Sequence, residues 1–292
     1  MKIISCFALV VMCFGTIFAS AKGMSYGIVG DMGRWNTNSK MIQDSMLRLK
    51  TNHLVMPGDN LYKLREGYRA VWAPWLDAGF VFSVVALGNH TLGYKEEVDF
   101  FKMPGEYYSK VDNENDIRFI VLNSDNRQNV ESQMTFLKNE LVSSPNKFNF
   151  IVYHHPSFTV SNVHKWSEKE QFQRAIRGIV KQHTGKITGL IWGYDHIAAT
   201  YDFEGVPVFL SGSAQDPRLG DIGPQDTMGY KFERKWLAPQ GLPYWLKMES
   251  TGSFKKSFIF KFIRAEDDQV MCTMKLTHNS SLEYRPDCQL KK

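Results

Sequence analysis

The sequence predicts an α/β protein whose core is a largely parallel β-sheet with a second sheet packed against it. Three observations lead to this fold class. Short β-rich runs alternate with amphipathic helical segments at about 30 residues per unit, which is typical of βαβ construction. Glycine or a polar residue stands directly after each of the early strands. Beyond residue 196 the helical pattern gives way to pairs of strands.

The first two thirds of the chain contain the alternating elements. Five strands are expected there, at Tyr26–Val29, His53–Met56, Phe80–Leu87, Phe148–Tyr153 and Ile187–Trp192. Apolar residues recur at helical spacing between some of them, which predicts helices at Ser39–Lys50, Ser132–Leu141 and Glu168–Gln182. In open α/β sheets the carboxyl ends of parallel strands line the ligand crevice, so we expect polar residues at these ends to be neighbours.

The last third predicts antiparallel pairs of strands. The expected strands are Ile197–Tyr201, Val206–Leu210, Ser257–Arg264 and Gln269–Leu276. Glu204-Gly205 predicts a turn between two of these strands, since glycine favours tight turns. The Pro- and Gly-rich stretch Gln215–Pro243 predicts a long, partly irregular loop near the ligand crevice.

The N-terminus has the pattern of a secretory signal peptide. Lys2 is followed by an uncharged apolar run, Ile3–Phe18, and Ala19-Ser20-Ala21 has the small-x-small form of a cleavage site. The run is shorter than the ~20 residues that span a bilayer, which disfavours the alternative of a membrane anchor. We therefore expect residues 1–21 to be removed and residues 22–292 to form one domain without membrane contact. Secretion would be to a periplasm, the extracellular space or an endomembrane lumen.

Cysteine usage agrees with export. Cys6 and Cys13 lie in the expected signal, which leaves Cys272 and Cys288 as the only pair. In an oxidising compartment we expect these two to form a disulfide that joins the C-terminal tail to the last strand. Two unrelated buried thiols are the alternative. The net charge of +5 is spread along the chain, which gives no indication of a nucleic-acid partner.

Several strand ends carry residues that can bind metals. They are Asp31, Asp59, Asn89, His90, His154 and His196. Carboxylates, an amide oxygen and imidazoles are ligands for divalent and trivalent cations. Each residue alone has an ordinary explanation, such as a turn, but donors at five separate strand ends together predict a metal centre. Four other histidines lie outside this pattern and are interpreted as structural or surface residues: His53, His164, His183 and His278.

The order and spacing of these residues resemble a known family. The motifs are Gly30-Asp31-Met32-Gly33, Gly58-Asp59-Asn60-Leu61-Tyr62, Gly88-Asn89-His90, His154-His155-Pro156 and Gly193-Tyr194-Asp195-His196. They resemble those of calcineurin-like metallophosphoesterases, and most closely the purple, tartrate-resistant acid phosphatases, from about residue 26 to residue 217. The resemblance implies a four-layer sandwich of two packed β-sheets flanked by helices. It also implies a small phosphorylated substrate, hydrolysed as a phosphomonoester by attack of a metal-bound hydroxide.

The resemblance also implies roles for individual residues. Asp31, Asp59, Tyr62 and His196 match the ligands of a first metal, which is ferric iron in that family. Asp59 bridges to a second metal, Fe, Zn or Mn, whose other ligands match Asn89 and His154. His90 matches a histidine that contacts the substrate phosphate and protonates the leaving group.

Tyr62 indicates which metal the first site holds. A phenol with an ordinary pKa near ~10 becomes a phenolate ligand at neutral pH only beside a strong Lewis acid, which trivalent iron provides. The alternative is a tyrosine that only packs beside the site.

Two positions depart from the family pattern. Tyr194 stands where the last motif has the first of two histidines, so the second metal loses a nitrogen donor. Tyr194 as phenolate, Asp195 or a water could fill the gap, and a weaker or empty second site is the plainest expectation. Thr91 stands where the family has an acidic residue, so His90 has no charged support from that position. Three functions stay open: a phosphomonoesterase, a phosphodiesterase of the same fold, and a weakly active or inactive metal- or phosphate-binding protein.

Overall fold

The structure is a computed structural model that describes most of the chain beyond the expected signal peptide. The described residues are 24–62, 65–126, 129–160, 164, 169–214, 216–218, 227–238, 241–251, 257–277 and 282–288. The predicted cleavage site and His278 lie outside them. Within the described residues, no helix is long and apolar enough to cross a membrane.

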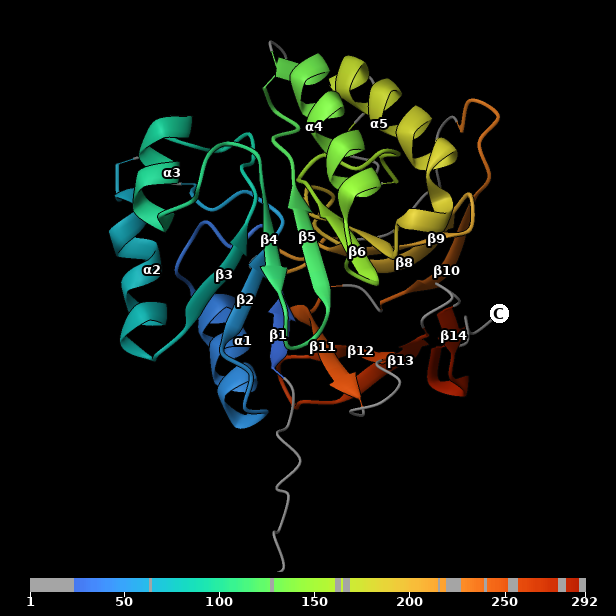
Figure 1. The fold of residues 1–292 in the computed structure, drawn as a ribbon. Coiled ribbons are helices and arrows are strands. Elements are labelled where there is room, and N and C mark those ends of the chain that lie inside the picture. The colour runs from blue at the N-terminus through green and yellow to red at the C-terminus, as the bar shows by residue number, and fades with distance from the viewer. Residues whose placement is uncertain are drawn as a thin grey trace, which may run out of the picture.

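The described residues contain two seven-stranded sheets (Figure 1). The first has the order β14-β13-β12-β11-β1-β2-β3, and its strands β1, β2 and β3 are parallel while the others pair antiparallel. Its strands are β1 (Ser25–Ile28), β2 (His53–Met56), β3 (Val81–Val85), β11 (Tyr244–Thr251), β12 (Ser257–Arg264), β13 (Val270–Leu276) and β14 (Leu282–Tyr284).

The second sheet has the order β10-β8-β9-β7-β6-β5-β4. Its central strands β5, β6, β7 and β9 are parallel, and β4, β8 and β10 pair antiparallel to their neighbours. The strands are β4 (Tyr108–Asp112), β5 (Ile117–Val121), β6 (Phe148–Val152), β7 (Gly189–Trp192), β8 (Ala198–Phe203), β9 (Val206–Ser211) and β10 (Phe232–Leu237).

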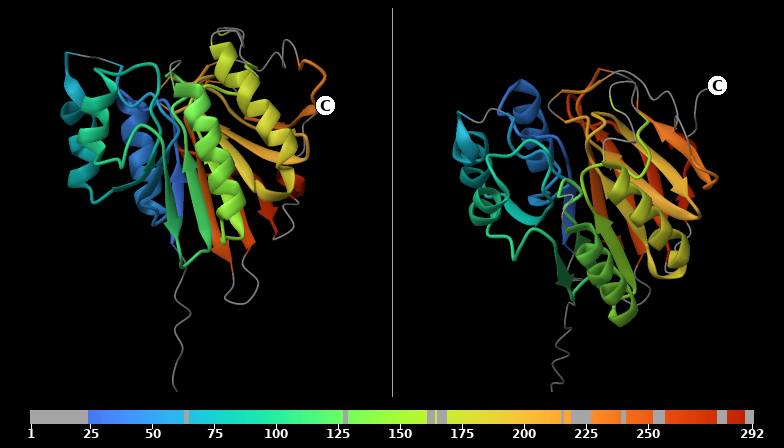
Figure 2. Two further views of the ribbon diagram at one scale, coloured as in Figure 1. Left: turned by 45° about the horizontal axis from the view of Figure 1, so that its top comes forward. Right: turned by 90° about the horizontal axis from the view of Figure 1, so that it is seen from above.

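Helices lie on the outer side of each sheet, which gives the four layers implied by the resemblance (Figures 1 and 2). The first sheet is flanked by α1 (Thr37–Arg48), α2 (Gly67–Asp77) and α3 (Tyr94–Phe101). The second is covered by α4 (Val130–Ser143) and α5 (Glu170–Gln182). Short 3-10 turns occupy Thr184–Lys186 and Pro286–Cys288.

Aromatic side chains fill the space between the two sheets. Phe209 of β9 stacks on Phe260 of β12 with ring centroids 4.3 Å apart, and Tyr26 of β1 meets Phe119 of β5 at 5.4 Å. On the outer face of the first sheet, Trp245 Nε1 donates a hydrogen bond to Ser45 Oγ of α1 at 2.9 Å. Burial of large aromatic side chains on both faces of a sheet is a major source of stability in such a fold.

Some elements differ from the prediction. Helices α2 and α3 and strands β4, β5, β11 and β14 were not predicted, and the expected loop Gln215–Pro243 contains β10. β10 lies at a sheet edge and has the sequence FERKWL, whose charged residues face solvent and hide the alternating apolar pattern of a strand. Trp236 and Trp245 are buried in the core. The expected disulfide is confirmed, since Cys272 of β13 is bonded to Cys288.

Candidate metal centre

The predicted donors meet where the carboxyl ends of the parallel strands of both sheets come together. Asp31, Asp59 and Asn89 follow β1, β2 and β3 of the first sheet. His154 and His196 follow β6 and β7 of the second. The two sheets are joined here by backbone contacts, such as the N–H of Gly30 to the carbonyl of Ser211 at 2.7 Å. Residues 165 positions apart in sequence are therefore neighbours, as the strand-end pattern predicts.

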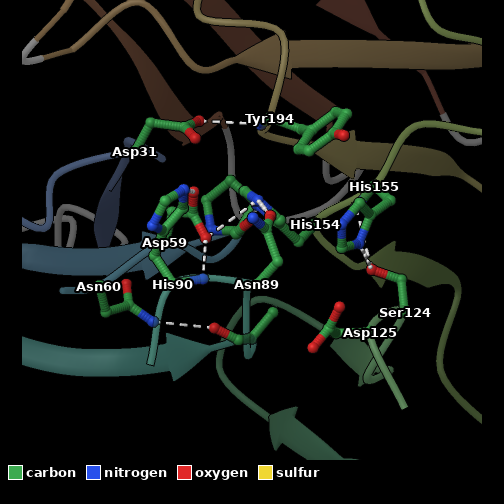
Figure 3. Close-up of polar contacts among 12 residues, drawn as sticks. Asp31, Asp59, Asn60, Asn89, His90, Ser124, Asp125, His154, His155 and Tyr194 are labelled. Atoms are coloured by element: carbon green, nitrogen blue, oxygen red, sulfur yellow. Dashed lines mark hydrogen bonds and ion pairs between the residues drawn. The ribbon is translucent and has the colours of Figure 1, made fainter. Parts of the chain in front are cut away.

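Three of the donors form a compact, buried cluster. One ligand atom from each of Asp31, Asp59 and His154 lies within 4.8 Å of the others, and all three residues are buried. Figure 3 shows Asp59 and His154 side by side, with Asn89 on the same side of the cluster. His154 Nε2 lies 3.2 Å from Asp59 Oδ1 and 3.2 Å from Asn89 Oδ1. Two buried carboxylates beside one another need a positive charge to compensate them, which a cation would supply.

The two strand-end histidines are oriented by backbone carbonyls. His154 Nδ1 donates to the carbonyl of Pro57 at 2.9 Å, and His196 Nδ1 donates to the carbonyl of Asp216 at 3.0 Å. Because a carbonyl oxygen only accepts, Nδ1 carries the proton in each ring and Nε2 is directed at the carboxylates. This is the usual arrangement of a histidine that binds a metal through Nε2.

The pKa shifts of the cluster residues show that the cluster favours a positive charge. Burial lowers the pKa of His154, but Asp59 more than offsets this and the pKa is raised to about 9. Burial would raise the pKa of Asp59, yet His154 and His90 hold it below its usual range. For Asp31, burial and then repulsion by Asp59 raise the pKa well above its usual range, although His154 acts in the opposite direction. A cation bound between Asp31, Asp59 and His154 would supply the positive charge that a proton on His154 otherwise supplies.

Tyr62 and His196 form the other wall of the cluster. The Tyr62 hydroxyl donates to Asp31 Oδ1 at 3.1 Å and lies 3.0 Å from His196 Nε2, which is itself 3.5 Å from Asp31 Oδ1. Burial, followed by the charges of Asp31 and Asp59, raises the pKa of the Tyr62 phenol well above its usual range. Burial lowers the pKa of His196 to about 4, so this ring is neutral and has a lone pair to offer. Tyr62 would become a phenolate only beside a strongly acidic cation.

The backbone at this end of the sheets is strained. Asp31, Asp59, Tyr194 and His196 have φ values of 59°, 55°, 75° and 55°, in the left-handed region that non-glycine residues rarely adopt. Each such residue costs on the order of 1–3 kcal/mol and persists only where the surroundings enforce it. The Gly88-Asn89-His90 motif requires glycine at its first position, because a Cβ there would lie 2.2 Å from Asp59 Oδ1.

His90 lies at the solvent side of the cluster. Its backbone N–H donates to Asp59 Oδ1 at 3.0 Å, and its side chain is 48% exposed. The ring Nε2 is 3.9 Å from Asp59 Oδ2, and the ring contacts Tyr62 with centroids 4.6 Å apart. The Asp59 carboxylate, the predicted bridge between the two metals, therefore also fixes the backbone of His90. The ring of His90 is exposed and accessible to a ligand.

Tyr194 does not direct its side chain at the carboxylates. Only its backbone N–H reaches Asp31, at 2.9 Å from Oδ2 (Figure 3). Its ring packs on His155 and His164 with centroids 4.6 and 4.0 Å apart. Within the described residues, the Tyr194 hydroxyl has no hydrogen bond. Asp195 accepts a hydrogen bond from the N–H of Val160 at 3.0 Å.

A cavity of about 210 Å³ opens at the cluster. Six residues of the motifs line it: Asp59, Tyr62, Asn89, His90, Tyr194 and His196. Four further residues complete the lining: Arg34, His164, Asp216 and Arg218. His164, interpreted from the sequence as a structural or surface residue, lines this cavity, and its ring contacts Tyr194. A single histidine between β6 and α5 gives no sequence signal for that position.

Glu97 of α3 is a buried carboxyl group that was not predicted from the sequence. It accepts hydrogen bonds from Asn60 Nδ2 at 2.7 Å and from the Tyr68 hydroxyl at 2.8 Å (the Asn60 contact is drawn in Figure 3). The Tyr68 hydroxyl in turn lies 2.8 Å from Thr91 Oγ1. Burial raises the pKa of Glu97 to about 7. Glu97 thus connects the residue after Asp59 with the residue after His90, although Thr91 itself carries no charge.

Comparison with known proteins identifies the fold. No model of a known protein family matches the sequence, and no curated protein does. Among solved structures, GAP50, the anchor in the inner membrane complex of Plasmodium, is 16% identical with a TM-score of 0.62, over 87% of this chain and 88% of that one. A purple acid phosphatase from yellow lupin seeds is 14% identical with a TM-score of 0.63, over 87% of this chain and 53% of that one. A dimetal phosphatase from Danio rerio is 12% identical with a TM-score of 0.57, over 88% of this chain and 99% of that one. The chain has the calcineurin-like metallophosphoesterase fold.

Proposed function

We propose that this chain is a metal-dependent phosphoester hydrolase that acts on phosphomonoesters, as an acid phosphatase does. The observation that carries the proposal is the buried cluster of Asp31, Asp59 and His154, whose ligand atoms lie within 4.8 Å of one another. It lies at the cavity of a metallophosphoesterase fold, at the strand ends where ligands of open α/β sheets bind. The same fold accommodates other functions, so the proposal rests on these residues and not on the fold alone.

Two metal positions follow from the donors present. Asp31, Asp59, Tyr62 and His196 would hold a first ion, for which the buried phenol of Tyr62 favours ferric iron. Asp59, Asn89 and His154 would hold a second ion, Fe, Zn or Mn, with fewer protein donors. When bound, the ions supply Lewis acidity and a nucleophile at neutral pH.

The residues of the chain would then orient the substrate and move a proton. Asn89 and His90 face the cavity beside Asp59 and are exposed, so a phosphate oxygen can approach both. His90, held through its backbone by Asp59, would hydrogen-bond the phosphate and protonate the leaving oxygen through its exposed ring. The buried Asp31 would stay fixed by Tyr62 and by the backbone of Tyr194, which preserves the geometry of the site during turnover.

A second candidate is a metal- or phosphate-binding protein with little or no turnover. The packing of the Tyr194 ring on His155 and His164 favours it, because this leaves the second position with only Asp59, Asn89 and His154. A loosely held second ion would give a weaker clamp on the phosphate.

One experiment separates these functions. The mature protein is purified, its Fe, Zn and Mn are counted, and p-nitrophenyl phosphate and bis(p-nitrophenyl) phosphate are assayed across pH with each metal added. A monoesterase hydrolyses the first substrate faster, and a diesterase hydrolyses the second faster. Asp59→Asn should abolish either activity, and Arg69→Ala, at an exposed position on α2, should not. Less than one metal per chain together with no turnover after metal addition would reject both hydrolase functions.

We also propose that residues 1–21 direct secretion and that residues 22–292 form the mature domain. The disulfide between Cys272 and Cys288 supports this, since such bonds persist mainly in oxidising compartments. N-terminal sequencing of protein recovered from the medium of an expressing cell tests it. A mature protein that begins at Met1 would contradict the proposal.

A further inference from the structure

The cavity extends beyond the residues that would bind metals and phosphate. Its lining also includes two arginines, Arg34 and Arg218, and Asp216, which lies two positions before Arg218 in the sequence. At about 210 Å³, the cavity is below the ~300–1,000 Å³ of pockets for drug-sized ligands. A compact phosphorylated group therefore fits inside it.

Hydrogen bonds to Tyr62 and Ser39 fix the backbone of Gly33 and Arg34 beside the first metal position. The carbonyl of Gly33 accepts the N–H of Tyr62 at 2.7 Å, and the carbonyl of Arg34 accepts the Ser39 hydroxyl at 2.5 Å. In the described part of the chain the Arg34 guanidinium forms no hydrogen bond or ion pair, and its Nε is buried without a partner. A buried donor without an acceptor is unfavourable. An anionic ligand in the cavity would supply that acceptor.

Arg218 is hydrogen-bonded to His196, which also lines the cavity. Its backbone N–H donates to the carbonyl of His196 at 2.9 Å, and its guanidinium pairs with Asp216 Oδ2 at 3.2 Å. Both side chains of that pair are partly exposed, at 39% and 55%, so the pair is weak and can exchange for a ligand. The segments of both arginines are thus bonded to residues of the first metal position, Tyr62 and His196, whose side chains lie 3.0 Å apart.

We propose that Arg34 and Arg218 form a subsite for a second phosphate group on the substrate. Guanidinium groups bind phosphate oxygens through two parallel hydrogen bonds, which suits them to this task. Two carboxylates line the cavity, and because Asp59 would be neutralised by the metals, Asp216 alone opposes the two guanidinium groups. The preferred substrates are then small bisphosphorylated molecules, with one phosphate at the metal positions and the other at the arginines. This inference rests on the proposed hydrolase function.

The kinetic test compares glucose 1,6-bisphosphate with glucose 6-phosphate. We expect kcat/KM to be about tenfold higher for the bisphosphate, well above the factor of about two that a second scissile group gives by itself. Arg34→Ala and Arg218→Ala should each lower this ratio about fivefold, and Arg34→Lys should lower it less because it keeps the charge. Arg69→Ala is the control and should leave the ratio unchanged. A ratio of about two or less in the natural protein, or an unchanged ratio in both alanine variants, overturns the proposal.

A binding test separates the subsite from catalysis. Methylenediphosphonate and methylphosphonate, which phosphatases do not cleave, are titrated calorimetrically into the metal-loaded protein, and the Fe, Zn and Mn in each sample are counted before and after the titration. The diphosphonate should bind more tightly, and each alanine variant should weaken its binding about tenfold. If the protein hydrolyses no phosphoester, this loss of binding still supports the subsite while the hydrolase proposal fails. Equal binding of both phosphonates, or unchanged diphosphonate binding in the variants, overturns the subsite.

Discussion

The backbone N–H of Tyr194 donates to Asp31 Oδ2 at 2.9 Å, while the Tyr194 ring packs on His164 on the far side of the residue. The backbone of Tyr194 thus contacts Asp31, a predicted ligand of the first metal. Its side chain occupies the position at which the resemblance implies a histidine ligand of the second metal. Any residue except proline retains the backbone contact. The side chain at position 194 can therefore be changed without removing a hydrogen bond from Asp31.

Tyr194→His should strengthen the second metal position. An imidazole at this position adds a neutral nitrogen donor to Asp59, Asn89 and His154, so we expect roughly tenfold tighter binding of the second ion and faster turnover. Equilibrium dialysis with Zn or Mn and steady-state kinetics measure both. Tyr194→Phe is the control and should change neither. If the histidine variant shows no gain and the phenylalanine variant loses metal, the tyrosine is itself a ligand.

Tyr62→Phe should remove the signature of ferric iron at the first position. The natural protein loaded with Fe(III) should absorb visible light through phenolate-to-iron charge transfer, and the variant should not. The change also removes hydrogen bonds to Asp31 and His196, so iron affinity should fall at least about tenfold. Tyr94→Phe is the matched control, since the Tyr94 hydroxyl bonds to Asp125 away from the cluster. An unchanged absorption band would show that Tyr62 only packs beside the site.

The sequence predicted which polar strand-end residues lie together more completely than it predicted the helices and strands. Glycine and a polar donor after each strand, as at Gly58-Asp59 and Gly88-Asn89, are local patterns, and the parallel topology brings them together without further information. Arg34 and His164 reach the cavity through tertiary contacts that no local pattern encodes. Glu97 is similar, because a glutamate in a short helix is most often exposed. Only the packing of α3 behind the strand ends makes it a buried group.

Gly88→Ala should disrupt the metal centre through steric contact alone. A Cβ at this position would lie 2.2 Å from Asp59 Oδ1 and 2.3 Å from the Asp59 nitrogen, so the bridging carboxylate must shift. We expect metal affinity to fall at least about tenfold and stability to fall by about 1–3 kcal/mol. Calorimetric metal titration and urea unfolding measure these effects.

Gly178→Ala is the control for that substitution. Gly178 lies within α5, and a Cβ there meets no atom within 4 Å. Alanine is favoured over glycine inside a helix, so this variant should gain about 0.5–1 kcal/mol of stability with unchanged metal affinity. Full metal affinity in Gly88→Ala would show that the loop after β3 can move away from Asp59.

Glu97→Gln should change how stability depends on pH. Burial raises the pKa of Glu97 from 4.5 to about 7, so the folded protein holds this proton more tightly than the unfolded chain does. The stability from this group is complete below about pH 4.5 and is lost as the pH rises through about 7. A shift of this size corresponds to about 3 kcal/mol.

Glutamine is neutral at every pH and can keep hydrogen bonds to Asn60 and Tyr68. In chelator-treated protein we therefore expect the two chains to have similar free energies of unfolding at pH 5. At pH 8 the glutamine variant should be more stable by up to about 3 kcal/mol. Urea unfolding at both pH values measures the difference, with Glu96→Gln at an exposed position of the same helix as the control. A difference that is the same at pH 5 and pH 8 would mean that Glu97 does not titrate between them, and that it orders the loops of Asp59 and His90 as a carboxylate throughout.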